Sequence, residues 1–197
     1  MATNFVIGLP HNPGFDPERE GWQKVREPGA TTALILGNIF SVLLLGLAYF
    51  VAATWWEFSV EALFTEHALW LMPIFVGLII LHERLHAVFH PGWGRSPHTV
   101  YGFIPKGLAF FAHYDARVTR NRSIIILAAP FFGFTVVPLL VASIWPPLAL
   151  LACYIAVINA SFSSLDLFNT ALILRDAPPG SEIRNQGWQS YWRLLDE

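Results

Sequence analysis

Two histidines and a glutamate stand at the spacing of a metal-dependent hydrolase site in the stretch His82-Glu83-Arg84-Leu85-His86. Residues four apart lie on one face of a helix, so both imidazoles can reach a single metal ion. The glutamate after the first histidine would then lie beside the water that such a metal activates, where it can act as a general base. The pattern therefore predicts a metal site with His82 and His86 as ligands and Glu83 as the catalytic base.

The helix that must carry this motif belongs to the second of four long apolar runs. The runs cover about residues 30–54, 68–90, 123–144 and 148–174, and each is long enough to cross roughly 30 Å of hydrocarbon. The chain is 54% hydrophobic and only 13% charged, about half the charged fraction of an average soluble domain. We therefore expect an all-α polytopic membrane protein with four transmembrane helices.

The basic residues predict how these helices are oriented. Apart from Arg84, every Lys and Arg falls before the first run, between the second and third runs, or from the end of the fourth run onward. The other two loops contain none. By the positive-inside rule, both termini and the central loop are then cytoplasmic. The net charge of −2 does not favour a nucleic-acid partner.

The segments outside the runs divide the chain into three parts. Residues 1–29 form a cytoplasmic N-terminal segment that prolines break into irregular structure, and residues 30–175 form the four-span membrane domain. In the cytoplasmic tail, residues 176–197, apolar residues recur at helical spacing, so we expect an amphipathic helix on the membrane surface or packed against the central loop. These residues are Trp188, Tyr191, Trp192 and Leu195.

The central loop, residues 92–122, contains a strand pattern. Residues 98–104 and 108–114 are rich in aromatic and β-branched side chains, and Pro105-Lys106-Gly107 stands between them. Two such runs around a turn predict a small cytoplasmic β-hairpin between the second and third transmembrane helices.

A catalytic zinc needs a third protein ligand besides the two histidines. His90 lies eight residues after His82, a rise of about 12 Å along a helix, which is too far to share an ion. We expect His90 at the membrane interface or as a helix C-terminal cap. Asp166 is the better candidate, because a carboxylate inside an apolar helix needs a partner and a metal would supply one. The alternative partners are Ser161, Ser163 and Ser164.

Asn159 lies seven residues before Asp166, hence on the same face of a straight helix. Its amide could donate a hydrogen bond to the oxyanion of a tetrahedral intermediate. Equally, it could form a polar contact between helices. The residue type does not decide between these two roles.

Together these motifs resemble those of the site-2 protease type of intramembrane metalloprotease. The short four-span layout is closest to the small prokaryotic zincin-type peptidases related to that group. The resemblance extends over about residues 68–174 and implies a Zn²⁺ ion held by His82, His86 and Asp166. It rests on the HERLH motif, on Ala128-Ala129-Pro130, and on Asn159 with Leu165-Asp166.

The same resemblance implies that Glu83 is the general base and that Asn159 assists at the oxyanion. The chain departs from the family pattern around Asn159. Phe162 stands where the family has proline, Leu167 stands where it has glycine, and one residue fewer separates the asparagine from the aspartate. These departures leave the HERLH motif untouched.

In that family, a strand-forming loop before the third span pairs with an unwound substrate. By analogy, the stretch Val100–Tyr114 would pair with substrate by strand addition, with Val100, Tyr101, Gly102 and Phe103 as substrate-binding residues. A purely structural hairpin is the alternative. The implied function is a zinc-dependent endopeptidase of the prokaryotic inner membrane that cleaves membrane-anchored proteins near the cytoplasmic face. Its partners would be the lipid bilayer and a membrane-protein substrate. A non-proteolytic metal-binding membrane protein is the competing class, and a metal transporter is a third.

Overall fold

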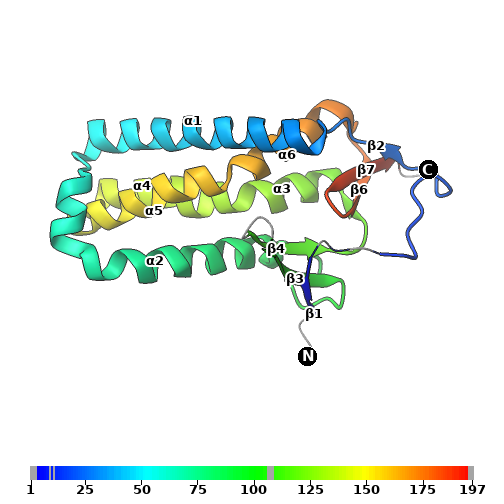
Figure 1. Ribbon diagram of the computed structural model, residues 1–197, viewed down its shortest axis with the longest axis horizontal. Helices are drawn as coiled ribbons and strands as arrows, with labels where there is room; N and C mark the ends of the chain where they lie inside the picture. Colours follow the sequence, from blue (N-terminus) through cyan, green and yellow to red (C-terminus); the bar gives the residue numbers. More distant parts are fainter. Residues whose placement is uncertain (1–3, 9, 11, 106–108, 195–197) are drawn as a thin grey trace. The chain divides into compact units, whose positions relative to one another are not determined.

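The computed structural model describes residues 4–8, 10, 12–105 and 109–194 (Figure 1). The chain forms two compact units. The helical unit comprises residues 30–82 and 128–168, and the sheet unit comprises residues 1–29, 83–127 and 169–197. Three helices are continuous across this division, namely α2 (Val60–Val88), α3 (Arg120–Phe131) and α6 (Ser164–Asp176).

The helical unit is built mainly from α1 (Ala30–Trp56), α2, α4 (Val137–Ile144) and α5 (Ala149–Phe162), with a short 3₁₀ turn, Pro146–Leu148, before α5 (Figure 1). Its core contains many small side chains; Ala52, Cys153 and Ala160 are each at most 1% exposed. Small residues let helix backbones approach closely, as they do in membrane proteins. This is how α1 and α5 pack against each other.

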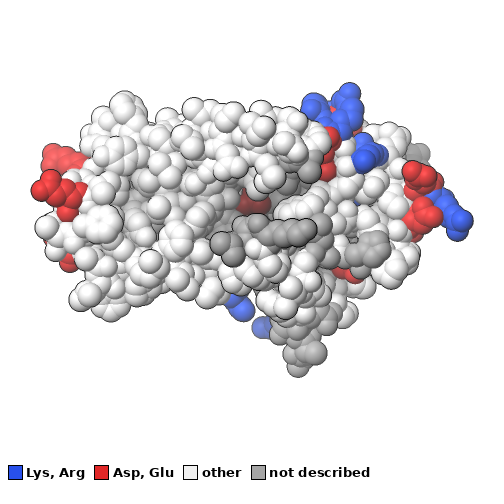
Figure 2. Space-filling model, in the orientation of Figure 1, with Lys and Arg blue, Asp and Glu red and all other residues white. Residues whose placement is uncertain are grey.

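Among the described residues, three helical segments are long and apolar enough to cross a membrane, namely Thr31–Trp56, Val60–Val88 and Arg120–Ile144. The pair Pro146–Phe162 and Ser164–Asp176 is bent by 50° and makes a fourth span if it counts as one. On the face seen in Figure 2, the helical unit is almost uncharged, and acidic side chains gather at the end where α1 meets α2. Mostly helical and rich in apolar helices, the chain is compatible with a membrane protein.

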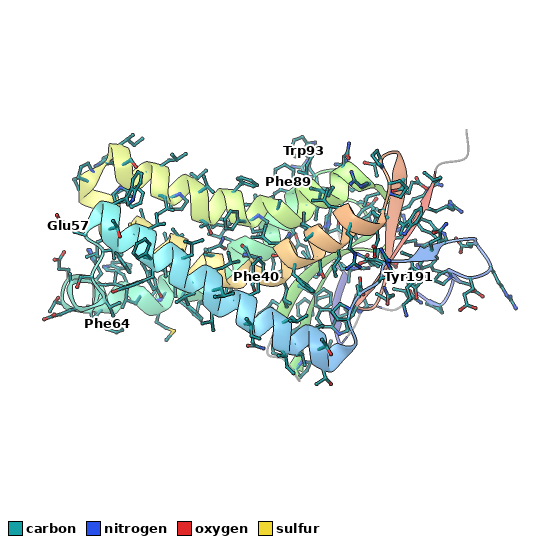
Figure 3. The ribbon with its side chains drawn as sticks, turned by 90° about the horizontal axis from the view of Figure 1, so that it is seen from above. Phe40, Glu57, Phe64, Phe89, Trp93 and Tyr191 are labelled. Carbon is teal, nitrogen blue, oxygen red and sulfur yellow. The ribbon has the colours of Figure 1, made fainter. Side chains whose placement is uncertain are left out.

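The second helix is longer than predicted, because it begins at Val60 rather than near residue 68. Ser59 precedes it and accepts the N–H of Ala62 on its Oγ at 3.3 Å, which satisfies a donor of the first turn. Glu61 lies in that turn, where a negative charge favours the helix. Figure 3 shows Glu57 and Phe64 at this end of the helical unit. Ser59 and Glu61 are helix-start signals that an apolar run alone does not contain.

The third span changes helix type in its middle. It consists of α3, a π-helical segment η2 (Phe132–Val136), and α4. Pro130 and Pro138 stand on either side of η2, and each removes one backbone N–H from the helical ladder. π-Helical turns inside α-helices are frequently found at functional sites.

The first sheet of the sheet unit contains the predicted hairpin. β3 (Thr99–Ile104) and β4 (Ala109–Tyr114) pair antiparallel, which confirms the prediction; its residues Lys106, Gly107 and Leu108 lie outside the described residues. β1 (Asn4–Ile7) pairs in parallel with the other side of β3, so the order is β1-β3-β4. A Cβ at Gly102 would lie 2.7 Å from the carbonyl oxygen of Val6, so the approach of β1 requires glycine.

The second sheet shows that the tail is a β-hairpin, which corrects the predicted amphipathic helix. Its strand order is β2 (Gln23–Lys24), β7 (Gln189–Leu194), β6 (Ser181–Gln186), β5 (Val118–Thr119). Gly187 has a φ of 60° and forms the turn between β6 and β7, a conformation that ends a regular helix. Trp192 packs against the buried Ile183, so it faces the core of this unit. Leu195 lies outside the described residues.

The N-terminal segment is also more ordered than predicted, because it supplies β1 and β2. Trp22 is 7% exposed, meets the ring of Phe15 edge-on at 5.5 Å, and lies under the guanidinium of Arg193 at 4.6 Å. Asp176, the last residue of α6, accepts the backbone N–H of Arg26 at 2.7 Å and its guanidinium at 3.1 Å. These contacts fasten the segment to the rest of the sheet unit.

Candidate metal centre

Asp166 and His82 meet inside the helical unit. The Nε2 of His82 lies 3.1 Å from the Oδ2 of Asp166, and the His82 side chain is 6% exposed. Asp166 is the third residue of α6, directly after the 50° bend that separates α5 from α6. A carboxylate in the first turn of a helix is stabilised by the positive end of the helix dipole. The structure therefore gives Asp166 a histidine partner on α2.

His86 follows His82 by one turn of α2, which is an uninterrupted helix from Val60 to Val88. One ligand atom from each of His82, His86 and Asp166 lies within 4.8 Å of the others. Tetrahedral zinc with bonds of about 2.0–2.1 Å spaces its ligand atoms roughly 3.3 Å apart, and the grouping of these three side chains is compatible with that spacing. This is the one group of three metal-ligating side chains found among the described residues.

Asn159 sets the hydrogen position on His82. Its Nδ2 donates to the carbonyl of Pro130 at 2.8 Å, and a carbonyl can only accept. The Oδ1 of Asn159 therefore faces the Nδ1 of His82, at 2.9 Å, and accepts its hydrogen. With the hydrogen on Nδ1, the lone pair of His82 is on Nε2, opposite the carboxylate of Asp166. Two acceptors 3.1 Å apart need a proton or a metal ion between them, so the pair fits a cation site.

His86 is held in the same tautomer by a backbone group. Its Nδ1 lies 2.7 Å from the carbonyl oxygen of Ile126 on α3, so Nδ1 must be the donor. The metal-binding atom of His86 is then Nε2, as it is for His82. Metal-bound histidines usually donate their other ring N–H to a carbonyl or carboxylate in this way. The donor set of two imidazoles and one carboxylate suits zinc.

Glu83 lies beside strand β4. Its Oε2 accepts the backbone N–H of Ala112 at 2.6 Å. Since N–H groups alternate along a strand, and that of Asp115 donates toward β3 at the carbonyl of His98, the N–H of Ala112 points away from β3. The predicted general base therefore faces the outer edge of the hairpin.

Asn159 was predicted either to assist at the oxyanion or to form a polar contact between helices. Its side chain is fully buried, and its amide group also contacts Thr135 Oγ1 at 3.0 Å and Ser163 Oγ at 3.2 Å. These contacts and the Pro130 carbonyl occupy its donors, so it fits the alternative of a polar contact between helices. α5 ends at Phe162, so Asn159 and Asp166 do not share one straight helix, yet both contact His82.

His90 is buried rather than interfacial. It is 1% exposed, and its Nδ1 lies 3.3 Å from Thr99 Oγ1. Burial lowers the pKa of His90 from 6.5 to about 3, and His86, His113 and Arg122 add to the shift. The backbone N–H of His90 donates to the carbonyl of Ala87 at 3.0 Å, which agrees with the predicted place at the C-terminal end of α2. The guanidinium of Arg122 donates to the carbonyls of Phe89 at 2.9 Å and His90 at 3.1 Å, just after this helix. Figure 3 labels Phe89 and Trp93 in the segment after α2.

The predicted substrate-binding residues lie on a strand that is paired on both sides. Val100, Tyr101, Gly102 and Phe103 align with Asn4–Ile7 of β1 on one side and with β4 on the other. Their backbone groups are therefore used within the sheet, so within the predicted stretch Val100–Tyr114 a substrate strand would have to pair with β4. The competing strand comes from more than ninety residues earlier in the chain, so the hairpin sequence could not reveal it.

Several residues that support the site escaped the sequence analysis. Ile126 and Ala112 contribute backbone atoms, which side-chain types do not reveal. Thr135 was accessible to sequence reasoning, because a polar residue inside an apolar span needs an internal partner. Ser163, considered above as a partner of Asp166, contacts Asn159.

Comparison with known proteins places the chain in a family. Residues 75–181 match the model of a family described as "Putative zincin peptidase". The match spans more than half of the 197 residues and includes the HERLH motif, the β3–β4 hairpin, Asn159 and Asp166. No curated protein and no solved structure matches the chain.

Proposed function

The chain belongs to this family of zincin peptidases, and we propose that it is a zinc-dependent endopeptidase that cleaves membrane-anchored proteins near the cytoplasmic face of the membrane. The observation that carries the proposal is the grouping of His82, His86 and Asp166, whose ligand atoms lie within 4.8 Å of one another, together with Glu83 on the helix that bears both histidines. A structural zinc site needs ligands but has no use for that glutamate. Glu83 therefore favours an enzyme over a metal-binding protein without activity.

The metal would be held by Nε2 of His82, Nε2 of His86 and Oδ2 of Asp166, with a fourth position left for water or substrate. When bound there, zinc supplies a Lewis acid that polarises the scissile carbonyl and lowers the pKa of water toward neutrality. Asn159 and the carbonyl of Ile126 keep the two imidazoles in the required tautomer. The protein thus provides both the ligands and their orientation.

Glu83 performs the proton transfers. Its carboxylate accepts a proton from the water as the water oxygen forms a bond to the peptide carbonyl carbon. The same carboxyl group then gives that proton to the leaving amine nitrogen as the C–N bond breaks. The 2.6 Å hydrogen bond from Ala112 fixes the carboxylate in place before substrate binds.

Substrate would pair with the outer edge of β4 instead of with β3. β4 is an edge strand of the described sheet, and the N–H groups of Phe110 and Tyr114 share the outward direction of Ala112. An extended peptide added there lies beside Glu83. Substrate helices must unwind first, because a helical peptide bond is shielded by its own turn.

The side chains of Tyr101 and Phe103 still contribute to such a surface. The strand register places them on one face of the sheet with three other apolar residues. Phe5 pairs with Tyr101 in one row, and Ile7, Phe103 and Phe110 form the next row. Phe5, Ile7 and Phe110 are 58%, 76% and 48% exposed, so this face is apolar and open. An unwound segment of a membrane protein, which is itself apolar, suits a strand bordered by that face.

The orientation in the membrane follows from charge. All 12 Lys and Arg residues belong to the sheet unit, and the segments of the helical unit contain none. By the positive-inside rule, the sheet unit and both termini lie in the cytoplasm, and the helices lie in a prokaryotic inner membrane. The candidate catalytic helix α2 then brings its last turns to the cytoplasmic side.

The decisive test compares wild type with Glu83→Gln in cells whose membrane proteins are searched for new N-termini by mass spectrometry. We expect cleavage products with wild type and a loss of about 10²–10⁴-fold in their rate of appearance with Glu83→Gln. Zinc content should stay at one ion per chain in both proteins. Glu61→Gln, in the exposed first turn of the same helix, is the matched control and should cleave normally.

Two outcomes separate the candidate functions. If Glu83→Gln cleaves as well as wild type with zinc bound, Glu83 is not the general base. If wild type binds one zinc and yields no new N-termini, the non-proteolytic metal-binding class is correct. Zinc flux into liposomes that His82→Ala abolishes would instead identify a transporter.

A further inference from the structure

One proline, Pro130, is linked to the hydrogen bonds that hold both metal-binding histidines. Pro130 is less than 2% exposed and lies inside α3, one residue before its end. In an α-helix the carbonyl of residue 126 accepts the N–H of residue 130. Proline has no N–H, so this position of α3 offers no such donor to Ile126. The carbonyl of Ile126 accepts the Nδ1 hydrogen of His86 instead, at 2.7 Å.

The carbonyl of the same proline orients the other histidine. It accepts the Nδ2 hydrogen of Asn159 at 2.8 Å. Since a carbonyl has only lone pairs to offer, this contact decides which way the Asn159 amide faces. The amide oxygen then accepts the Nδ1 hydrogen of His82 at 2.9 Å. Because Pro130 has no N–H, the carbonyl of Ile126 is left for His86. The carbonyl of Pro130 orients Asn159, which in turn binds His82.

We infer that Pro130 is a positioning residue that sets the tautomer of both metal-binding histidines. Each imidazole then presents Nε2 to the metal before the metal arrives, so binding requires no ring flip or proton shift. The inference rests on the proposed zinc site, because it takes the two histidines as ligands. It assigns to one proline two functions that neither its side chain nor its general helix-kinking effect would provide.

The first test is Pro130→Ala in the full-length protein in lipid nanodiscs. The new N–H of residue 130 competes with His86 for the carbonyl of Ile126, so His86 loses its fixed tautomer. We expect zinc affinity, measured by competition with a chelator of known affinity, to fall about 10–100-fold, the usual effect of losing a partner of a metal-bound histidine. Pro138→Ala, in the same span but beyond η2, is the matched control and should bind zinc as wild type does.

The second test separates the missing N–H from the shape of proline. Lactic acid, the α-hydroxy analogue of alanine, is incorporated at position 130, so that the backbone has an ester there and again lacks an N–H. The ester variant and Pro130→Ala have the same side chain. We expect the ester to restore zinc affinity to within a few-fold of wild type. If it binds zinc as weakly as Pro130→Ala, the missing N–H is not the cause and the inference is wrong.

A third measurement does not depend on the metal or on proteolysis. ¹⁵N chemical shifts of the zinc-free protein should show hydrogen on Nδ1 of both His82 and His86, and a mixed tautomer of His86 in Pro130→Ala. If zinc binds tightly and Pro130→Ala changes neither affinity nor tautomer, the inference fails and the proposed function stands. If the tautomers change as expected but wild type cleaves nothing, the proposed function fails and the role of Pro130 stands.

Discussion

The helical unit and the sheet unit use buried polar side chains in different ways. In the helical unit these side chains are few, and most of them belong to one hydrogen-bonded group that includes His82. In the described part of the sheet unit they are more numerous and their partners vary; Ser181 donates to the carbonyl of Pro178 three residues away, and Glu182 pairs with Arg117 and Arg193. The group in the helical unit consists of His82, Thr135, Asn159 and Ser163.

The difference has a physical origin. The segments of the helical unit contain no Lys or Arg, and their helices are apolar enough to lie in lipid. A polar group without a partner there costs several kcal/mol, on the order of 2–7, so each one must have a reason to be present. In the sheet unit, water and charged side chains are close, so a polar residue there needs no special explanation. A buried polar side chain is therefore informative in the helical unit and uninformative in the sheet unit.

The strongest test of this comparison replaces proposed ligands of the helical unit. His82→Ala and Asp166→Ala each remove one of three ligands, so zinc affinity should fall by well over the roughly 100-fold that marks a supporting residue. Zinc content after dialysis against buffered free zinc is the measurement. His98→Ala, which alters an exposed histidine of the sheet unit, should leave it unchanged. Full zinc binding by His82→Ala would place the metal elsewhere and remove the basis of the comparison.

A finer test compares one asparagine from each unit. Asn159→Ala leaves the Nδ1 hydrogen of His82 and the hydroxyls of Thr135 and Ser163 without their partner, at a cost of about 1–3 kcal/mol for such a group. We expect zinc affinity to fall about 10–100-fold together with a lower unfolding midpoint. Asn185→Ala is the matched control, because the Oδ1 of Asn185 is already buried without a hydrogen-bond partner. Equal effects of the two substitutions would show that the polar group of the helical unit has no special role.

The sequence predicted the centre of the site better than its surroundings. His82, His86 and Asp166 were found because ionisable side chains in an apolar helix are rare and costly, and the structure groups them as proposed. The hairpin β3–β4 was predicted from two runs of aromatic and β-branched residues around a turn, and the structure confirms it. β1 was not predicted, because its four-residue parallel pairing with β3 has no local signal. The prediction of a helix in the tail was wrong because the spacing of its aromatic residues fits a helix as well as a strand. The positive φ of Gly187, in the turn between β6 and β7, is incompatible with a continuous helix.

The contributions of Ile126 and Pro130 could not be predicted from residue types. Both supply carbonyl groups, and every residue has one, so only the fold reveals which carbonyl meets an imidazole. For Asn159, the residue type left two uses open for a related reason. Its amide is suited equally to an oxyanion and to a buried imidazole, and the choice depends on the bend that follows α5.

The smallest expected effect concerns His90, a buried polar residue of the sheet unit outside the proposed site. Its folded-state pKa of about 3 lies below its ordinary 6.5, so it stabilises the fold above pH 6.5 and this stability is lost as the pH falls toward 3. Between pH 7 and 5 the loss is about 2 kcal/mol, at 1.36 kcal/mol per pKa unit. The measurement is denaturant unfolding of the zinc-free protein at both pH values. His90→Gln should be less sensitive to pH by about that amount.

The zinc-free condition matters, because metal affinity itself depends on pH and a bound metal would be released by acid in both proteins. With no zinc present, the difference in pH sensitivity between wild type and His90→Gln isolates the one histidine. His98→Gln, which alters an exposed residue, should behave as wild type. If His90→Gln is as sensitive to pH as wild type, His90 reaches water in solution. The sheet unit would then be even more tolerant of polar side chains than its buried surface indicates.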